Sequence, residues 1–253
     1  MSGDRAGPTS GVAVIVPCKD ESLRVGRTVA ALASIPEVDL VVVVDDGSTD
    51  DTAAVAARAG AQVVRHAANA GKAAALTTGL QHIRALGADG RSQGPVLFAD
   101  GDLEDSAANL RALILPVRAG LADLAIATLP PQRTTGGGHG FVVRLARKGI
   151  ASLTGFRARQ PLSGMRCLSP LAVAAATPLA RGWGVEVGMT IDVLRAGLTV
   201  LEVPTELHHR VTGADWRGQV HRARQYRDVW LALRARQLAD VAASLRARRA
   251  RST

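Results

Sequence analysis

Short apolar runs alternate with stretches of helical spacing along the first half of the chain. The five runs cover residues 12–17, 40–44, 61–65, 95–99 and 123–128. Apolar, β-branched runs of this length are typical of strands buried on both faces. The stretches between them show helical spacing over residues 23–34, 51–59, 69–86 and 106–118. This alternation predicts an α/β fold in which helices cover both faces of a mostly parallel sheet.

The pattern changes after residue 128. Residues 130–140 are rich in glycine, proline and threonine, and this composition predicts a mobile loop. Helical spacing then returns over residues 141–154, 170–176 and 186–196, and the apolar run of residues 199–203 predicts a strand. A long basic helical pattern follows from residue 219 to about residue 245. At the other end, we expect residues 1–10 to be a disordered leader.

Acidic residues follow three of the predicted strands. They are Asp20 and Glu21, then Asp45 and Asp46, and finally Asp100, Asp102 and Glu104. Because the carboxyl ends of parallel strands meet at one edge of a sheet, where ligands bind, we expect these carboxylates to share a site. Mg²⁺ takes oxygen ligands and typically sits between one or two carboxylates and the phosphates of a substrate. The alternative for residues 100–104 is an acidic start to the following helix.

Composition excludes some classes of protein. The 253 residues are 47% hydrophobic but contain no long apolar run free of charges and helix breakers, so no membrane-spanning helix is expected. The first residues lack the basic and apolar segments of a signal peptide. Cys18 and Cys167 are too few for a disulfide framework, so we expect a cytoplasmic location.

The formal net charge of +9 comes mainly from arginine. A basic chain suits nucleic acid, an anionic membrane surface or phosphorylated substrates. No nucleic-acid partner is expected, because the arginines are not interleaved with stacking aromatic residues. The last predicted helix carries Tyr226 and Trp230 near one face, with arginines around them. Three alternatives stay open for this helix: packing against the domain, lying on the inner face of the cell membrane, or forming a homodimer contact.

Four motifs occur in the order and at the spacing of a known enzyme family. They are Val14-Ile15-Val16-Pro17 with Glu21, the Val-Val-Val-Asp-Asp-Gly-Ser-Thr-Asp run of residues 42–50, Asn69-x-Gly71-Lys72, and Asp100-x-Asp102. Over residues 12–128 the chain thereby resembles the family 2 glycosyltransferases, which have the GT-A (Rossmann-like) fold. This resemblance implies transfer of a sugar from a nucleotide-diphosphate sugar, with Mg²⁺ or Mn²⁺ as cofactor.

The second half resembles two groups of such enzymes. Arg159-x-x-x-Ser163-Gly164 and Val203-Pro204 with Arg210-Val211-x-Gly213 are similar to the polyprenyl-phosphate sugar synthases. Gln160-Pro161-Leu162, the Gly-Val-Glu-Val-Gly sequence of residues 184–188, and His209-Arg210 are similar to the glucosyl-3-phosphoglycerate synthases. The leading hypothesis is therefore a phosphorylated acceptor of the polyprenyl-phosphate type. The alternative is a small soluble acceptor such as 3-phosphoglycerate.

The resemblance also implies roles for individual residues. The metal ligands would be Asp100, Asp102, Glu104 and His209. The nucleotide sugar would be bound by Pro17, Asp20, Glu21, Asp45, Asp46, Lys72 and Asp100. The acceptor phosphate would be bound by Arg144, Arg159, Ser163 and Arg210, and the catalytic residues would be Asp102, Glu186 and Arg210.

The chemistry behind these roles is the cleavage of a sugar–diphosphate bond. A metal that bridges the two phosphates neutralises the charge that develops on the leaving nucleotide. A phosphate acceptor is already ionised, so it needs no general base. Structural roles stay open as alternatives for the same residues. In these alternatives Asp45 or Asp46 only caps a turn, the arginines pair with surface carboxylates, and Glu186 starts a helix.

These hypotheses divide the chain into segments. Residues 11–128 form the nucleotide-sugar-binding half of a GT-A domain, and residues 129–216 form the acceptor-binding half of the same domain. Residues 217–253 form a C-terminal basic helix and tail. The sequence leaves open the base and sugar of the donor, the inverting or retaining outcome, and the oligomeric state.

Overall fold

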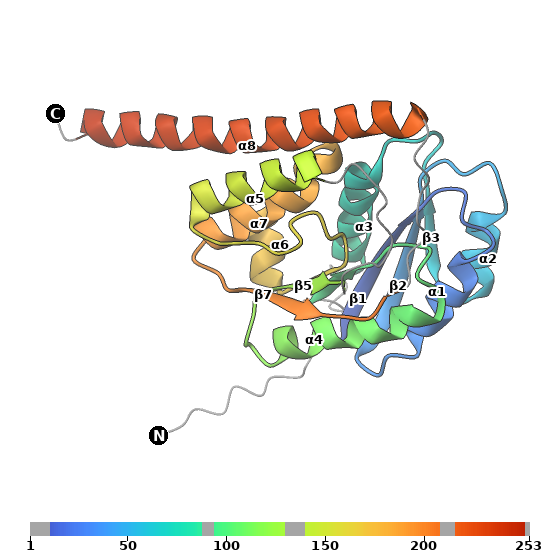
Figure 1. Cartoon of the computed structure of the whole chain (residues 1–253). Helices are drawn as coiled ribbons and strands as arrows, with labels where there is room; N and C mark the ends of the chain where they lie inside the picture. The colour runs from blue at the N-terminus through green and yellow to red at the C-terminus, as the bar shows by residue number, and fades with distance from the viewer. Residues whose placement is uncertain (1–10, 88–93, 130–139, 208–215, 251–253) are drawn as a thin grey trace, which may run out of the picture.

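The computed structural model describes residues 11–87, 94–129, 140–207 and 216–250, with side chains for residues 223–241 of the last segment (Figure 1). The predicted leader lies outside these described residues, and so do residues 130–139 of the predicted loop. His209 and Arg210, predicted in the metal and acceptor sites, also lie outside them. Gly140, the last residue of the predicted loop, is instead the first residue of a helix.

The described residues form one seven-stranded sheet. Its strands are β1 (Val12–Cys18), β2 (Val38–Asp45), β3 (Gln62–Arg65), β4 (Val96–Phe98), β5 (Leu124–Thr128), β6 (Arg166–Leu168) and β7 (Val200–Pro204). Their order across the sheet is β3-β2-β1-β4-β6-β5-β7. Among these seven strands only β6 is antiparallel to its neighbours, so the predicted, mostly parallel sheet is confirmed.

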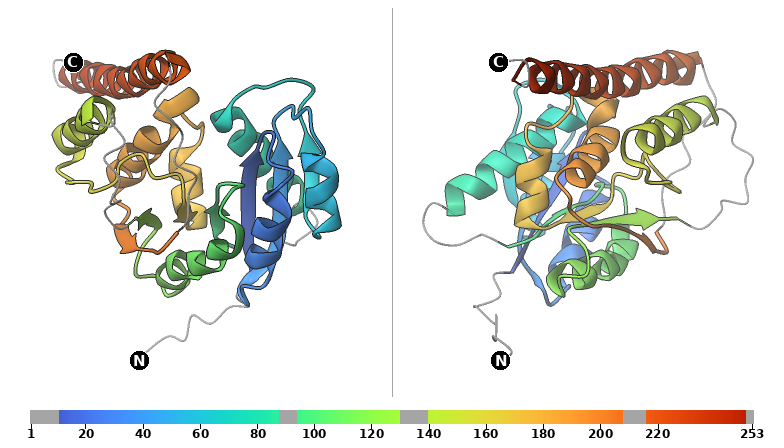
Figure 2. Two further views of the ribbon diagram at one scale, coloured as in Figure 1. Left: turned by 45° about the vertical axis from the view of Figure 1, so that its right-hand side comes forward. Right: turned by 90° about the vertical axis from the view of Figure 1, so that its left-hand side faces the viewer.

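Helices cover both faces of this sheet (Figures 1 and 2). They are α1 (Val25–Ala33), α2 (Thr52–Arg58), α3 (Lys72–Gly87), η1 (Glu104–Leu110), α4 (Arg111–Arg118), α5 (Gly140–Thr154), α6 (Pro170–Ala176), η2 (Gly182–Gly184), α7 (Val185–Arg195) and α8 (Trp216–Ala250). In the part of the chain that the structure describes, none of them has both the length and the apolar character needed to cross a bilayer.

Separate hydrophobic clusters lie on the two faces. On one face α1, α2, η1 and α4 pack against Val14, Val16 and Val43. On the other face α3, α6 and α7 pack against Ile15 and Val44. Successive residues of a strand point to opposite faces, so burial on both faces explains why these strands are continuously apolar. A third cluster joins α5, α7 and α8, and α8 lies across this pair of helices outside the sheet (Figure 2).

The strand β6 was not predicted from the sequence pattern. It has three residues, and one of them is the charged Arg166, so no apolar run marks it. It is nevertheless completely buried, because it lies between β4 and β5. The predicted helix of residues 106–118 also differs in detail, since it consists of the 3₁₀ helix η1 followed by α4.

The close approach of α3 to β1 depends on Gly79. A Cβ atom added at this position would lie 2.5 Å from Cγ2 of Ile15, which is fully buried. A Gly79→Ala substitution should therefore lower the free energy of unfolding by about 1–3 kcal/mol, because overpacking outweighs the gain in helix propensity. Urea denaturation would measure the change.

Gly26 in α1 provides the matched comparison. An added Cβ there would meet only Val55 Cγ1, at 3.0 Å, within the described structure. Gly26→Ala should be close to neutral. Equal losses for the two variants would contradict the packing argument.

Candidate active site

A small cavity lies where the carboxyl ends of β1, β2 and β4 meet the start of α3. Since β1 is parallel to both of its neighbours, the segments after these strands emerge at one edge of the sheet. The cavity has a volume of about 130 Å³ and is lined by Pro17, Cys18, Lys19, Asp46, Lys72, Ala75 and Asp100. Four of the predicted nucleotide-binding residues are thus brought together: Pro17, Asp46, Lys72 and Asp100.

A cluster of charged side chains forms one wall of this cavity. Lys72 Nζ lies 2.7 Å from Asp100 Oδ1 and 3.7 Å from Glu186 Oε1. Burial raises the pKa of Glu186, although Lys72 and Arg166 oppose this. Burial would lower the pKa of Lys72, but the carboxylates of Asp100 and Glu186 outweigh it, so the pKa is raised. The lysine therefore stays charged and joins the end of β4 to the start of α7.

Asp46 holds the loop that precedes α3. Its carboxylate accepts hydrogen bonds from the N–H groups of Ala70 at 2.8 Å and Gly71 at 2.7 Å. Its Oδ1 atom also lies 2.7 Å from His66 Nδ1, and His66 Nε2 lies 2.9 Å from Thr78 Oγ1 on α3. Burial raises the pKa of Asp46, but these hydrogen bonds outweigh it and the net shift is downward. Asp46 thus fixes the position at which α3 begins.

Asp45 and Asp20 stabilise the turn after β2. Asp45 is fully buried; its Oδ1 atom accepts a hydrogen bond from the Ser48 N–H at 2.9 Å, and its Oδ2 atom lies 3.1 Å from Arg65 Nε. Asp20 Oδ1 accepts from the Thr49 N–H at 2.8 Å. The structural role left open for Asp45 is therefore observed, and nucleotide binding by either residue stays a prediction.

The segment after β4 carries the predicted metal ligands. Asp100 and Asp102 are partly exposed on the turn at the edge of the sheet. The Glu104 carboxylate instead lies 2.5 Å from Arg27 Nη1 and 3.8 Å from Arg24 Nε. Within the described ranges, no three His, Cys, Asp or Glu side chains are grouped to hold a metal by themselves. Two carboxylates on one turn fit a Mg²⁺ or Mn²⁺ ion whose other ligands are diphosphate and water oxygens.

A fully buried arginine organises the loop that leads into β6. Arg166 donates hydrogen bonds to the carbonyl oxygens of Ser163 at 2.7 Å, Pro161 at 3.1 Å and Glu186 at 2.9 Å. It also donates to Thr190 Oγ1 at 2.9 Å. Burial lowers the pKa of Arg166 to about 10, so the guanidinium group is still charged at neutral pH. Arg166 thereby fixes this loop against α7.

The same loop passes close to Lys72, which lines the small cavity. A Cβ atom added at Gly164 would lie 2.3 Å from Lys72 Nζ and 3.4 Å from Asp100 Oδ1, so a larger residue there would displace the lysine. The neighbouring Ser163 Oγ is buried and has no hydrogen-bond partner among the residues that the structure describes. Ser163 is not among the residues that line the two cavities described for this site, so its binding of an acceptor stays a prediction.

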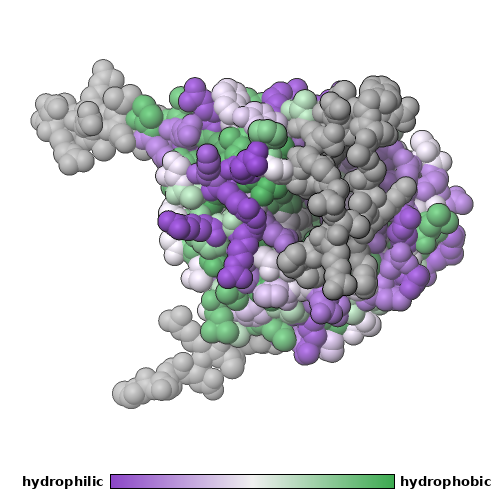
Figure 3. Space-filling view, viewed as in Figure 1, coloured by the Kyte–Doolittle hydropathy of each residue, from purple (hydrophilic) through white to green (hydrophobic). Residues whose placement is uncertain are grey.

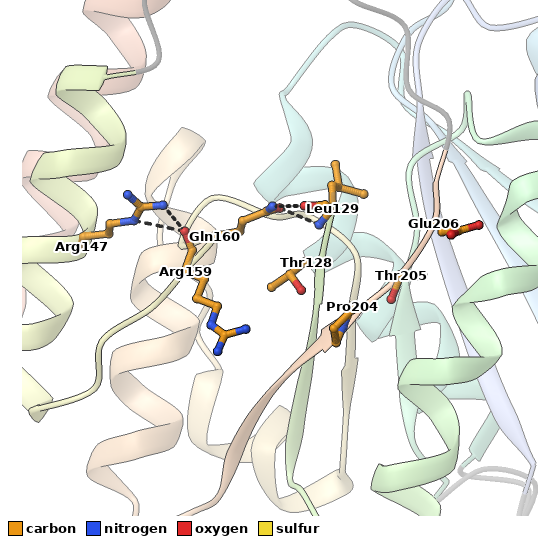
Figure 4. A pocket seen from close by; sticks show the side chains of 8 residues that line it. All are labelled: Thr128, Leu129, Arg147, Arg159, Gln160, Pro204, Thr205 and Glu206. Atoms are coloured by element: carbon orange, nitrogen blue, oxygen red, sulfur yellow. Dashed lines mark hydrogen bonds between the residues drawn. The ribbon is translucent and has the colours of Figure 1, made fainter. Parts of the chain in front are cut away.

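A larger cavity lies at the carboxyl ends of β5 and β7 (Figure 4). Its volume is about 580 Å³, and it is lined by Thr128, Leu129, Arg147, Arg159, Gln160, Pro204, Thr205 and Glu206. The Arg159 N–H donates to Glu202 Oε1 at 2.7 Å, and the Arg159 carbonyl oxygen accepts from Arg147 Nε at 3.1 Å. With its backbone held from both sides, Arg159 extends its side chain into the cavity (Figure 4).

Two of the predicted site residues have partners away from the cavity walls. Glu21 accepts a hydrogen bond from Arg24 Nη1 at 3.0 Å. The guanidinium carbon of Arg144 lies 4.5 Å from the centroid of the Phe141 ring, whereas Arg147 on the same helix lines the large cavity. Arg147 was not predicted as a site residue, because helical spacing puts both arginines on α5 without showing which one reaches Arg159.

The described fold and its acidic turn define the class of protein. Parallel strands β3-β2-β1-β4, the turn with Asp100 and Asp102 after β4, and the antiparallel β6 beyond it make up a GT-A domain. The model of the family "Glycosyl transferase family 2" matches residues 13–152, more than half of the chain. The chain belongs to this family, and the predicted fold class and family are confirmed.

Several relatives are similar to the chain. The glycosyltransferase AglJ of Haloferax volcanii is 28% identical over 185 residues, which are 69% of this chain and 56% of AglJ. An uncharacterized glycosyltransferase of Mycobacterium tuberculosis is 41% identical over 111 residues, or 40% of this chain and 46% of that protein. The chain thus spans about half the length of the curated relatives it matches.

One solved structure is similar over most of the chain. It is glucosyl-3-phosphoglycerate synthase from Mycobacterium tuberculosis, in complex with Mn²⁺, uridine diphosphate and glucosyl-3-phosphoglycerate. The TM-score is 0.70 at 27% identity, and the match covers 90% of this chain and 80% of that chain. The shared fold therefore extends beyond the residues matched by the family model.

The anchoring role of Asp46 leads to a stability prediction. Asp46→Ala should lower the free energy of unfolding by about 2–3 kcal/mol at pH 7, because it removes a buried charged acceptor. The folded state holds the pKa of Asp46 below 3.8, so this contribution is present above pH 3.8 and is lost as the pH falls through the folded-state pKa. Urea denaturation at pH 7 and pH 3 would show both effects.

Asp51 is the control for this measurement. It is exposed before α2 and caps that helix with no side-chain hydrogen bond within the described structure. Asp51→Ala should change stability by no more than about 0.5 kcal/mol. A similar loss of unfolding free energy for both variants would show that the hydrogen bonds of Asp46 do not stabilise the loop before α3.

Proposed function

We propose that this chain transfers a sugar from a nucleotide-diphosphate sugar to a phosphorylated acceptor. The observation that carries the proposal is the joint placement of Lys72, Asp100 and Glu186 at the carboxyl edge of a family 2 GT-A domain. A lysine is a suitable partner for the diphosphate as a point charge. The solved relative that binds uridine diphosphate supports a uridine nucleotide as donor.

A divalent cation is part of this proposal. Asp100 and Asp102 would hold Mg²⁺ or Mn²⁺, both of which accompany uridine diphosphate in structures of the solved relative. When bound, the ion would neutralise the negative charge that develops on the leaving diphosphate. Lys72 adds a fixed positive charge beside the same phosphates. Pro17 and Asp46 line the same cavity.

The large cavity is the proposed acceptor site. Arg147 and Arg159 line it together with one carboxylate, that of Glu206, so the positive charges are in excess and attract an anion. Thr128 and Thr205 add neutral polar groups. Such a mixture suits a small molecule that carries a phosphate and hydroxyl groups. The likeness to glucosyl-3-phosphoglycerate synthase favours a phosphorylated hydroxy acid, because the match covers 90% of this chain.

A hydroxyl acceptor needs a partner for its proton. Glu186 is 5% exposed and its pKa is raised by burial, so it is a stronger base than an ordinary glutamate. It lies 3.7 Å from Lys72 at the small cavity, next to the proposed diphosphate. Glu186 is therefore our candidate for the group that accepts the hydrogen bond of the acceptor hydroxyl.

Polyprenyl phosphate is the second candidate acceptor. The outward side of α8 carries exposed apolar side chains among arginines; these are Tyr226, Trp230, Leu231, Leu238 and Val241 with Arg224, Arg227 and Arg234. Apolar and hydrophilic side chains alternate along this edge of the molecule (Figure 3). A helix of this kind can lie on an anionic membrane, which would place the protein at the surface where a lipid phosphate is found.

A transfer assay tests the reaction and separates the two acceptors. The full chain, Mn²⁺ and labelled nucleotide sugars would be incubated with 3-phosphoglycerate or with a detergent-dispersed polyprenyl phosphate. We expect label in a soluble anionic product, and Asp102→Ala should lower the rate at least about 100-fold, because the ion would lose a ligand.

Asp51→Ala is the control here too, because that residue is exposed at the start of α2. Label that enters the organic phase instead would select the lipid acceptor. Absence of transfer from every nucleotide sugar would refute the proposed activity, and full activity of Asp102→Ala would refute the metal assignment.

The acceptor site predicts a selective kinetic effect for Arg159. Arg159→Ala removes the guanidinium group but keeps the backbone hydrogen bonds to Glu202 and Arg147. The KM for the phosphorylated acceptor should rise about tenfold to a hundredfold, since a charge-assisted hydrogen bond is lost, while the KM for the donor stays unchanged. Steady-state kinetics with each substrate varied in turn would measure this. Arg58→Ala, at the exposed end of α2, should leave both values unchanged.

A further inference from the structure

One face of α1 is hydrogen-bonded to the turn that carries Asp100 and Asp102. Thr28 is fully buried, and its Oγ1 atom accepts a hydrogen bond from the Glu104 N–H at 2.8 Å. The same hydroxyl group donates to the carbonyl oxygen of Gly101 at 2.9 Å. A single side chain therefore fixes the backbone on both sides of Asp102.

The turn needs such support because its backbone is strained. Glu104 has a φ of +49°, one of two non-glycine residues with a positive φ among those described. A residue with a side chain keeps this conformation only where its surroundings hold it. The hydrogen bond from its N–H to the fully buried Thr28 supplies that restraint.

The Glu104 carboxylate adds a second contact to the same helix. It lies 2.5 Å from Arg27 Nη1 and 3.8 Å from Arg24 Nε. Arg24, Arg27 and Thr28 are spaced i, i+3 and i+4, so they share one side of α1. The Arg27 side chain is 59% exposed, and exposed ion pairs contribute little. The buried hydroxyl of Thr28 should therefore carry most of the restraint.

We propose that Thr28 is a positioning residue for divalent-cation binding at Asp100 and Asp102. In this proposal Glu104 is not a third metal ligand; it belongs to the contacts that hold the turn against α1. The inference rests on the proposed function, since it takes the two aspartates as the cation site. Partners outside the direct ligands affect metal affinity about tenfold to a hundredfold, because they hold the ligands in place. Thr28 acts through its two hydrogen bonds to the backbone, at Gly101 and Glu104.

The first test measures cation binding without any transfer reaction. Free Mn²⁺ would be followed by electron paramagnetic resonance while the full chain is titrated with Mn²⁺ in the presence of uridine diphosphate. Thr28→Val keeps the shape of the side chain but removes the hydroxyl, and should weaken Mn²⁺ binding about tenfold. Thr28→Ser restores the hydroxyl and should bind Mn²⁺ within about twofold of the unsubstituted protein.

Thr154 is a matched control at the end of α5. Its hydroxyl also accepts from a backbone N–H, that of Phe156, and donates to a backbone carbonyl, that of Ile150. Thr154→Val should lose stability without a change in Mn²⁺ affinity. Unchanged affinity in a folded Thr28→Val variant would overturn the positioning role, and so would equal weakening by Thr154→Val. If the unsubstituted protein binds uridine diphosphate without any dependence on Mn²⁺, the proposed metal site itself fails.

A double-mutant cycle separates the two roles of Glu104. If Glu104 acts through its ion pair with Arg27, Glu104→Ala and Arg27→Ala should weaken Mn²⁺ binding by similar factors of about two to five. The double variant should then bind Mn²⁺ no more weakly than either single variant. Asp102→Ala serves as the reference, because it shows how much Mn²⁺ affinity is lost when a direct ligand is removed. A loss for Glu104→Ala as large as that for Asp102→Ala, with Arg27→Ala unchanged, would make Glu104 a ligand and overturn this part of the inference.

Discussion

The ion pair between Lys72 and Asp100 is the constraint on which the rest of the site depends. A largely buried ammonium group loses hydration, and only nearby carboxylates can offset this loss. Asp100 supplies one carboxylate at the end of β4, and Glu186 supplies another at the start of α7. Because these three residues come from distant parts of the chain, α3, β4 and α7 must keep their relative positions for the charges to balance. Under the proposed function, a diphosphate at this edge would meet a cation already held in place, so little would have to be reorganised for binding.

The large cavity is connected to this ion pair by the loop that contains Arg159 and Gly164. Arg159 lines the large cavity, and Gly164, five residues later, lies against Lys72 at the small one. Arg166 then fixes the end of the loop through four hydrogen bonds, three of them to carbonyl oxygens. A buried guanidinium group has enough donors to satisfy several carbonyl oxygens at once, which an irregular buried loop requires. The relative positions of the two cavities therefore depend on this loop.

The sequence predicted most of the first half because its signals are local. Continuous apolar runs mark β1, β2 and β5, and polar residues after them mark the edge where Asp46, Lys72 and Asp100 meet. The second half depends on contacts between distant residues, so its details were not predicted. The three-residue β6 is a strand only because β4 and β5 flank it, and Arg147 lines the large cavity because of where Arg159 lies. The partners of Glu104 likewise lie on α1, 77 residues away in the case of Arg27.

The helix α5 links the large cavity to the long helix α8. Arg147 extends from α5 to the cavity, and two residues later Gly149 allows α8 to approach, since a Cβ atom there would lie 2.4 Å from Leu233 Cδ2. The inner side of α8 is thus committed to packing against α5 and α7, while its outer side is left with Leu231 and Trp230 exposed among arginines. A surface or molecule that contacts this outer side of α8 would lie on a helix that packs directly against α5, which supplies Arg147. Under the proposed function, the selection of a soluble or a lipid-linked acceptor therefore depends on the position of α5 as well as on the shape of the cavity.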